Sequence, residues 1–301
     1  MIPKTRPLSL LILIKLLAAV AISPLQAYPP KIEGATEYVY KSVDGVDLKI
    51  WVFSPSSSDV NAAPVPAMLF YFGGGWHGGN PEQFTAQSQY LAERGMIGIV
   101  ADYRVKSRNN VQAKSCVEDA YDAFKYITTH AKKLGIDPSR VGVGGGSAGG
   151  HLAACVGTVH ASKDRGPYAM ALYNPVTTLA PIDFNKNPSL GTSEDHATQN
   201  QALEAKQGQL RHRLGVEPAT LSPFHNIQKA TPPALILHGT HDKTVPYESA
   251  VLFHKQLKAK GISSTLKTYK SAGHGFFNRE PYRTQTNAAL EQFLKGLGWL
   301  Q

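Results

Sequence analysis

The stretch Gly145-Gly146-Ser147-Ala148-Gly149 is the feature from which the fold can be worked out. It has the form G-x-S-x-G and lies between an apolar run at 141–143, which predicts a strand, and residues 148–156, which predict a helix. A serine on a sharp strand-to-helix turn has a crowded backbone, and glycines two positions before and after it remove the side chains that would clash. Its hydroxyl then stands at a helix N-terminus, where free N–H groups favour a developing anion. The pattern therefore predicts that Ser147 is a nucleophile.

A second glycine-rich stretch, Phe72-Gly73-Gly74-Gly75-Trp76, follows the continuous apolar run at 67–72. Glycines directly after a strand let backbone N–H groups point at a substrate oxygen, and acyl transfer needs two or three such donors beside the nucleophile. We predict that the N–H groups of Gly74, Gly75 and Ala148 form this oxyanion hole. Trp76 and His77 are candidates for contact with a substrate, although an exposed position suits His77 better.

A serine nucleophile needs a base to accept its proton and an acid to orient that base. Two later strand ends supply them. His238-Gly239-Thr240-His241-Asp242 follows the predicted strand at 234–237, and Ser271-Ala272-Gly273-His274-Gly275-Phe276 follows the predicted strand at 265–269. Functional side chains gather beyond the C-terminal ends of parallel strands. We therefore predict His274 as the base and Asp242 as the acid that orients it.

The remaining histidines and acids favour structural roles. His151 lies one turn along the predicted helix and should pack against the sheet, and His238 should form local hydrogen bonds. His241, next to Asp242, is the main rival for the role of base. A zinc site built on His238 and His241 lacks a third ligand nearby, so we expect no metal and no cofactor. We expect Arg104 to pair with Asp119 or a neighbour and to hold a helix on the sheet.

The rest of the chain alternates strands with helices. Residues 37–40 and 46–53 predict a hairpin around Asp44-Gly45, and the apolar runs at 67–72, 96–101 and 169–173 predict buried strands. Helices are predicted at 81–94, 115–134, 247–260 and 284–297. This order predicts an α/β fold whose mostly parallel sheet has an antiparallel N-terminal hairpin and helices on both faces. Residues 176–231 are polar and break the rhythm, so we predict a lid-like insertion or the wall of a cleft there.

The first 27 residues have a basic start, an apolar stretch and a small residue at Ala27. This layout is typical of a secretory signal peptide, and a retained membrane anchor is the alternative. We predict cleavage after Ala27, a single domain at 28–301, export to the periplasm or the medium, and no membrane span once the signal is removed. The formal net charge of +9 comes from scattered basic residues without aromatic interleaving, so we expect no nucleic-acid partner.

The two cysteines, Cys116 and Cys155, both fall on predicted helices. A disulfide between them is chemically possible in an oxidising compartment. Helix geometry rarely brings two Cβ atoms to bonding distance by accident, which favours buried free thiols. Both states remain open at this point.

With these motifs in hand, the chain resembles the α/β-hydrolase superfamily, and within it the hormone-sensitive-lipase-like esterases and the bifunctional feruloyl and acetylxylan esterase group. The resemblance runs from about Tyr40 to the C-terminus and rests on Phe72-Gly-Gly-Gly-Trp76, Ala101-Asp-Tyr-Arg104, Gly145-Gly-Ser-Ala-Gly-Gly-His151, Leu221-Ser-Pro-Phe-His225, His238-Gly-Thr-His-Asp242 and Ala272-Gly-His-Gly-Phe276.

The resemblance implies an α/β-hydrolase fold and a serine esterase that deacylates small-molecule or polysaccharide esters, with acetyl or feruloyl as the acyl group. One residue departs from the pattern. The family's glycine motif usually begins with a histidine that braces the loop, and Phe72 stands at that position here. The departure puts the brace in question and leaves the backbone N–H donors in place.

Two other functions fit the same motifs. A peptidase or an aryl-formamidase would keep the triad and change only the bond that is cleaved. A non-catalytic binding protein on a hydrolase scaffold has usually lost a triad member, whereas all three candidates are present here. The oligomeric state is left open by the sequence.

Overall fold

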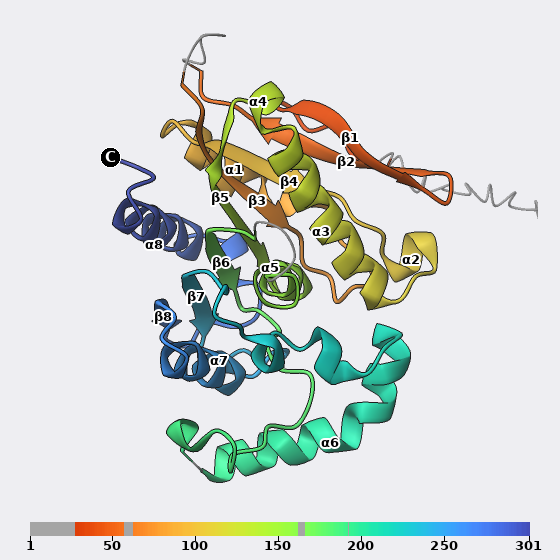
Figure 1. Cartoon of the computed structure of the whole chain (residues 1–301), viewed down its shortest axis with the longest axis vertical. Helices are drawn as coiled ribbons and strands as arrows, with labels where there is room; N and C mark the ends of the chain where they lie inside the picture. Colours follow the sequence, from red (N-terminus) through yellow and green to blue (C-terminus); the bar gives the residue numbers. More distant parts are fainter. Residues whose placement is uncertain (1–27, 57–62, 162–165, 192) are drawn as a thin grey trace, which may run out of the picture.

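The computed structural model describes residues 28–56, 63–161, 166–191 and 193–301, so the predicted signal peptide at 1–27 lies outside the described residues. The described strands form one sheet in the order β1-β2-β4-β3-β5-β6-β7-β8. Figure 1 shows the N-terminal hairpin at one end of this sheet and β8 at the other. The predicted fold class is confirmed.

The hairpin consists of β1 (Thr36–Val43) and β2 (Val46–Phe53), and β2 continues antiparallel onto β4 (Ile97–Ala101). All other pairings are parallel. They join the remaining strands, which are β3 (Val65–Tyr71), β5 (Ile136–Gly146), β6 (Ala169–Tyr173), β7 (Ala234–Gly239) and β8 (Ser264–Tyr269). The inner strands β4, β6 and β7 are buried along their whole length, which explains why their sequences are apolar without alternation.

Helices cover the two faces of the sheet. On one face, the hydrophobic core includes α3 (Ala113–Thr129), α5 (Ala148–Thr158) and α7 (Tyr247–Ala259). On the other, it includes α1 (Thr85–Ala92) and α8 (Tyr282–Gly296). The strand faces alternate between the two cores, as the pleat requires: Leu69 belongs to the first and Phe70 to the second.

Three predicted elements differ from those observed. The helix expected at 115–134 is divided into α3 and a short α4 (Ala131–Leu134), because the His130 backbone leaves helical geometry with φ −100° and ψ 18°. The Nδ1 atom of its ring lies 2.9 Å from the carbonyl of Tyr126. The strand expected at 141–143 is longer, because β5 also pairs with Val65 of β3 through Ile136. The helix expected at 81–94 begins as a 3-10 turn, η1 (Pro81–Phe84), before α1.

The insertion at 176–231 carries a helix that the sequence analysis did not place. α6 (Glu194–Leu214) starts where the Ser193 hydroxyl accepts the His196 N–H at 3.2 Å, and it ends at Gly215. Three short 3-10 turns flank it: η2 (Pro188–Leu190), η3 (Pro218–Leu221) and η4 (Pro223–Asn226). Figure 1 shows α6 crossing below the sheet and climbing at its C-terminal end toward α2 (Lys106–Asn109) and α3.

Cys116 and Cys155 are both buried free thiols, the favoured alternative of the sequence analysis. Burial raises the pKa of Cys116 to about 12 and raises that of Cys155 further, so neither side chain is a reactive thiolate.

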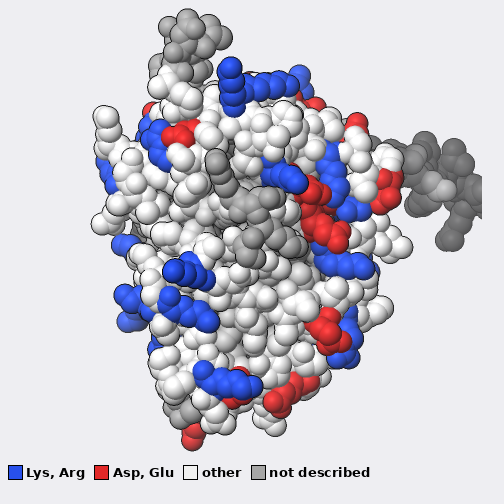
Figure 2. Space-filling model, in the orientation of Figure 1, with Lys and Arg blue, Asp and Glu red and all other residues white. Residues whose placement is uncertain are grey.

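Among the described helices, none has the length and apolar character needed to cross a bilayer. Figure 2 shows Lys and Arg in separate patches on this face of the molecule.

Candidate active site

The structure brings Ser147, His274 and Asp242 together in one hydrogen-bonded line. Ser147 occupies the turn between β5 and α5, Asp242 follows β7, and His274 follows β8. The Nε2 atom of His274 lies 2.9 Å from the Ser147 hydroxyl, and its Nδ1 lies 2.7 Å from Oδ2 of Asp242. A histidine thus stands within hydrogen-bond reach of a serine hydroxyl and is itself oriented by a carboxylate, which is the arrangement that nucleophilic catalysis requires.

The turn at Ser147 is strained in the way the glycine pattern predicts. Ser147 has φ 55° and ψ −117°, a conformation that a non-glycine residue rarely adopts. A Cβ on Gly145 would lie 2.5 Å from the carbonyl carbon of Gly149, and one on Gly149 would lie 2.1 Å from the Tyr71 carbonyl oxygen. The two glycines therefore allow β3, β5 and α5 to approach closely enough to raise the serine above the sheet.

Asp242 is surrounded by hydrogen-bond donors. Its Oδ1 accepts the N–H groups of Thr244 and Val245, each at 2.9 Å, and its Oδ2 also lies 3.4 Å from Nε2 of His238. Burial acts to raise the pKa of Asp242, but the hydrogen bonds from His238, His274 and the two N–H groups hold it well below its usual range. The carboxylate therefore stays ionised and can hold the Nδ1 proton of His274.

The glycine loop lies directly against the nucleophile. A Cβ on Gly73 would meet the Gly146 carbonyl oxygen at 2.8 Å and the Ser147 Cβ at 3.3 Å. The Gly73 N–H donates to Oε1 of Gln83 at 2.6 Å, and the carbonyl of Gly74 closes the loop by accepting two backbone N–H groups. Within the described parts of the chain, the N–H groups of Gly74 and Gly75 donate to no protein acceptor, so they can serve a substrate oxygen.

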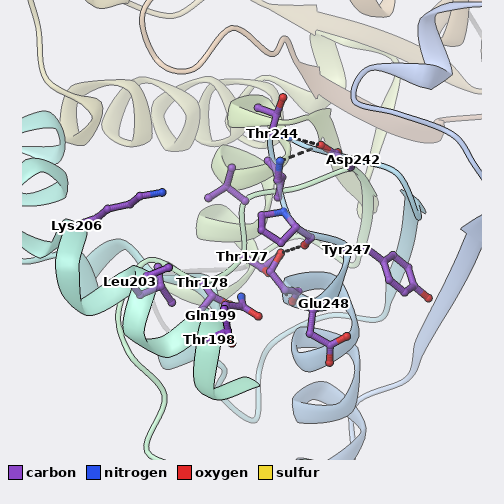
Figure 3. Close-up of a pocket in the computed structure, with 15 residues that line it drawn as sticks. Thr177, Thr178, Thr198, Gln199, Leu203, Lys206, Asp242, Thr244, Tyr247 and Glu248 are labelled. Carbon is purple, nitrogen blue, oxygen red and sulfur yellow. Dashed lines mark hydrogen bonds between the residues drawn. The ribbon is translucent and has the colours of Figure 1, made fainter. Parts of the chain in front are cut away.

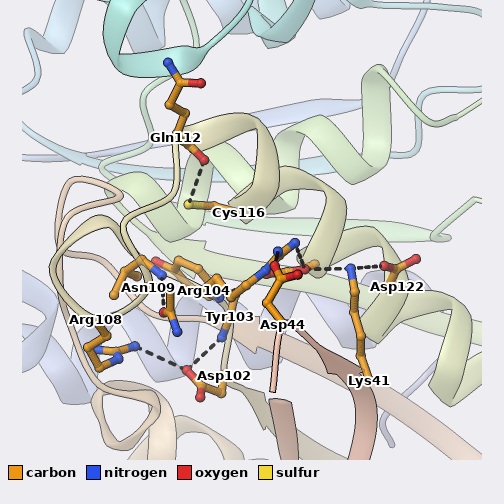
Figure 4. A network of polar contacts seen from close by, with 12 residues as sticks. Lys41, Asp44, Asp102, Tyr103, Arg104, Arg108, Asn109, Gln112, Cys116 and Asp122 are labelled. Carbon is orange, nitrogen blue, oxygen red and sulfur yellow. Dashed lines mark hydrogen bonds and ion pairs between the residues drawn. The ribbon is translucent and has the colours of Figure 1, made fainter. Parts of the chain in front are cut away.

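Phe72, at the position where the resemblance leads us to expect a histidine, keeps the loop in place through aromatic contacts. Its ring stacks on Tyr103 with 4.1 Å between centroids, and the Tyr103 hydroxyl donates to the Phe72 carbonyl at 2.7 Å. Farther along the loop, Nη1 of Arg108 donates to the Gly79 carbonyl at 2.8 Å. Figure 4 shows Arg108 and Tyr103 converging on Asp102.

The predicted pair between Arg104 and Asp119 is confirmed. The guanidinium grips the buried carboxylate with two hydrogen bonds of 2.8 and 2.9 Å. Lys41 of β1 adds an ion pair to Asp119 at 2.7 Å and also pairs with Asp122, beside which Figure 4 shows it. This network holds α3 to the hairpin and to the end of β4, which is a structural role.

Trp76 and His77 occupy different environments. Trp76 is only 6% exposed, and its Nε1 donates to Nδ1 of His151 at 3.2 Å. Burial lowers the pKa of His151 to about 4, so its ring is neutral and its Nε2–H donates to the Leu221 carbonyl at 2.7 Å. Trp76 is thus fastened beneath the loop, whereas His77 is exposed. His241 is also exposed, and His274 alone of the two meets Ser147.

Two further residues support the candidate triad: Asn174, which carried no recognisable signal in the sequence, and His238, whose local hydrogen bond was predicted. Oδ1 of Asn174, which follows β6, accepts the Gly275 N–H at 3.2 Å and so supports the loop of His274. His238, expected to bond locally, donates to the Val245 carbonyl at 3.0 Å beside Asp242. The contact of Asn174 joins the loops after β6 and β8, which are distant in the sequence, and only the folded sheet brings them together.

A cavity of about 560 Å³ opens beside Asp242, between α6 and the loop that follows β7. Figure 3 shows side chains from both elements pointing toward it. The first lining residue after β6, Val176, has its N–H 3.5 Å from the Ser147 carbonyl, so the cavity begins next to the nucleophile turn. Its walls mix hydroxyl, amide and apolar groups, including Thr177, Thr178, Gln199, Leu203, Thr244 and Val245.

The described residues include no group of three His, Cys, Asp or Glu side chains that could hold a metal.

Comparison with known proteins gives the family. Residues 52–257 match the family model BD-FAE, which stands for bifunctional feruloyl/acetylxylan esterase. The chain belongs to the BD-FAE family. It is also similar to a thermophilic esterase, Est2, from the Planctomycetes species Thermogutta terrifontis, whose propionate-bound structure is 39% identical with a TM-score of 0.78. That match covers 91% of this chain and 98% of Est2.

Two more distant relatives are named as esterases as well. Carboxylesterase NlhH of Mycobacterium tuberculosis is 26% identical over 266 residues, which is 86% of this chain and 79% of the relative. A probable isoprenylcysteine alpha-carbonyl methylesterase of Arabidopsis thaliana is 25% identical over 268 residues, and the match covers 85% of this chain and 55% of the plant protein. The chain thus spans about half the length of the plant relative. Family and fold place this BD-FAE protein among the carboxylic ester hydrolases of the α/β-hydrolase superfamily.

Proposed function

We propose that this BD-FAE protein hydrolyses carboxylic esters through an acyl-enzyme on Ser147. The observation that carries the proposal is the line from Asp242 through His274 to the Ser147 hydroxyl, with separations of 2.7 and 2.9 Å. This line ends beside a loop whose Gly74 and Gly75 N–H groups are open to a substrate oxygen. The hydrogen-bonded line of the three side chains and the position of the glycine loop against Ser147 support this proposal.

In the proposed reaction, the Ser147 oxygen attacks the ester carbonyl while Nε2 of His274 takes the hydroxyl proton. Asp242 stabilises the imidazolium through the Nδ1 hydrogen bond, and the N–H groups of Gly74, Gly75 and Ala148 hold the oxyanion. His274 then gives its proton to the departing alcohol oxygen as the C–O bond breaks. A water molecule repeats the sequence on the acyl-enzyme, which releases the acid and restores Ser147.

We further propose acetyl or feruloyl esters of polysaccharide-derived alcohols as substrates. Family membership supports this choice, and so does the character of the cavity beside Asp242. Among the described residues, its lining includes the hydroxyls of Thr178 and Thr244 and the side-chain amide of Gln199, which are groups of the kind that hydrogen-bond the hydroxyl groups of a sugar. Est2 has been solved with propionate and with butyrate bound, which favours a short acyl group here as well.

The test is the hydrolysis of a small panel by wild type, by Ser147→Ala and by Ser263→Ala as a control on an exposed serine. The panel contains 4-nitrophenyl acetate, a long-chain 4-nitrophenyl ester, acetylated xylan, methyl ferulate and a formylated aromatic amine. We expect Ser147→Ala to lower kcat by about 10⁴-fold or more while circular dichroism stays unchanged. A near-normal rate in Ser147→Ala would contradict the mechanism, and preferred turnover of the formylated amine would point to an aryl-formamidase.

A further inference from the structure

The loop that carries the oxyanion donors is held in an unfavourable conformation. Gly75 has φ 63°, and Trp76, which has a bulky side chain, has φ 58°. A non-glycine residue in this region costs roughly 1–2 kcal/mol and persists only where surrounding contacts impose it. Phe72, Tyr103 and Arg108 secure the two limbs of the loop, and Trp76 is held by His151 and by the Lys106 N–H. A further contact holds the Gly75 carbonyl at the tip.

That contact comes from the insertion. Arg213, in the last turn of α6, donates from Nη2 to the Gly75 carbonyl at 2.6 Å. Its guanidinium carbon also lies 4.9 Å from the centre of a Trp76 ring, which is a cation–π distance. A Cβ on Gly75 would be 2.9 Å from the same Nη2, so the side chain packs closely on the glycine. One arginine therefore contacts both strained residues.

The backbone of Arg213 is itself fixed on either side. The carbonyl of His212 accepts a hydrogen bond from Nε2 of Gln112 at 2.7 Å, and Leu214 is completely buried. Gly215 ends the helix with φ 79° against the Gln112 side chain. The Arg213 side chain consequently extends to the loop from a helix end whose backbone is held in place, although the side chain itself is exposed.

We propose that Arg213 is a positioning residue for the oxyanion hole. By pinning the Gly75 carbonyl and the Trp76 ring, it fixes the peptide plane that follows Gly75. This limits movement of the Gly75 Cα, and so it helps to keep the preceding N–H, that of Gly75, directed at the oxygen of the tetrahedral intermediate. The insertion then contributes to the chemical step, beyond covering the cavity. This role rests on the proposed esterase function.

The test compares Arg213→Met, Arg213→Lys and, as a matched control on the same helix, Arg211→Met. Arg211 has the same side chain, but it pairs with Glu217 at the surface. With 4-nitrophenyl acetate, we expect Arg213→Met to lower kcat about 10-fold with KM little changed, because an oxyanion contact acts in the transition state. Arg213→Lys, which keeps the charge and one donor, should recover part of the loss, and Arg211→Met should match wild type.

A second readout separates positioning from stability. Phenylboronic acid forms a tetrahedral anion with an active-site serine, so its affinity should fall with kcat in Arg213→Met while thermal unfolding stays unchanged. Unchanged kcat and boronate affinity in Arg213→Met would overturn the proposal, as would a rise in KM alone, which would make Arg213 a substrate contact. If wild type shows no turnover that depends on Ser147, the proposed function itself fails, and the positioning role fails with it.

Discussion

At the scale of single residues, two buried carboxylates show how hydrogen-bond donors decide ionisation. Asp242 and Asp102 are both almost fully buried. Four donors hold the pKa of Asp242 well below its usual range. Burial of Asp102 is the stronger effect: it raises the pKa to about 6 against the contributions of Tyr28, Arg108 and the Tyr103 N–H. The first carboxylate suits a catalytic partner for histidine, and the second costs the fold stability when it ionises.

Asp102→Asn should therefore change how stability depends on pH. The folded-state pKa of Asp102 lies above the unfolded value of 3.8, so the folded protein binds the extra proton between about pH 4 and pH 6. Wild type should lose stability as pH rises through this window, by an amount of the order of 3 kcal/mol. Asn mimics the neutral acid and should lack this component. Urea unfolding of both proteins from pH 4 to 7 measures the difference.

We expect the free energy of unfolding of Asp102→Asn to increase relative to that of wild type as pH rises. A difference in unfolding free energy that is constant from pH 4 to 7 would contradict it. The contribution of Asp242 to stability depends on pH in the opposite direction. Because its folded-state pKa is depressed, this contribution is present above about pH 4 and is lost as pH falls. The general loss of stability in acid should consequently appear in both proteins.

At the scale of elements, α5 and α6 differ in how much of their surface is buried. Every residue of α5 is buried, and the helix touches β3, β5 and β6. α6 is polar on all sides and largely exposed. Glycine has a different purpose in each helix: Gly149 in α5 lies against the strand carbonyls, whereas Gly208 in α6 has open space around its Cα.

Alanine at these two positions should have effects of opposite sign. In Gly149→Ala the new Cβ would stand 2.1 and 2.3 Å from the Tyr71 and Phe72 carbonyl oxygens, so backbone must shift, and we expect a loss of about 1–3 kcal/mol or more. In Gly208→Ala we expect a gain of about 0.5–1 kcal/mol from helix propensity. Chemical denaturation of both variants measures this, and a Gly149→Ala protein as stable as wild type would refute the close approach of α5.

At the scale of the whole molecule, the segment that follows the predicted signal peptide is docked on the enzyme. The Tyr28 hydroxyl donates to Asp102, and the Arg108 guanidinium lies 3.8 Å from the centre of the Tyr28 ring. Arg108 also holds Gly79 of the glycine loop. A chain that begins at Tyr28 would therefore retain every contact described for the catalytic domain.

We propose that the protein is exported and that its mature form begins at Tyr28. When the full chain is expressed in a bacterium with its own N-terminus, we expect active enzyme in the periplasm or the medium. Its N-terminal peptide, determined by mass spectrometry, should start at Tyr28. A membrane-bound enzyme that retains residues 1–27 would show that the segment is an anchor, and a cytoplasmic enzyme would exclude export.

The sequence by itself determined the fold class and the residues of the candidate triad. Ser147, His274 and Asp242 are each marked by local chemistry, since glycine spacing or a strand end identifies them without reference to distant residues. The buried strands are equally legible, because their cover on both faces requires continuous apolar runs. Because each motif is recognisable from its own residues, the motifs and their order along the chain were enough to identify the superfamily.

Tertiary structure alone decided the parts that depend on long-range contact. α6 has no apolar stripe, because little of it faces the core, so periodicity could not reveal it. Arg213 on Gly75, Gln83 on Gly73 and Asn174 on Gly275 are hydrogen bonds between polar side chains and backbone groups. Such contacts leave no pattern in the sequence, because any surface arginine or amide looks the same until the chain folds around the loop it holds.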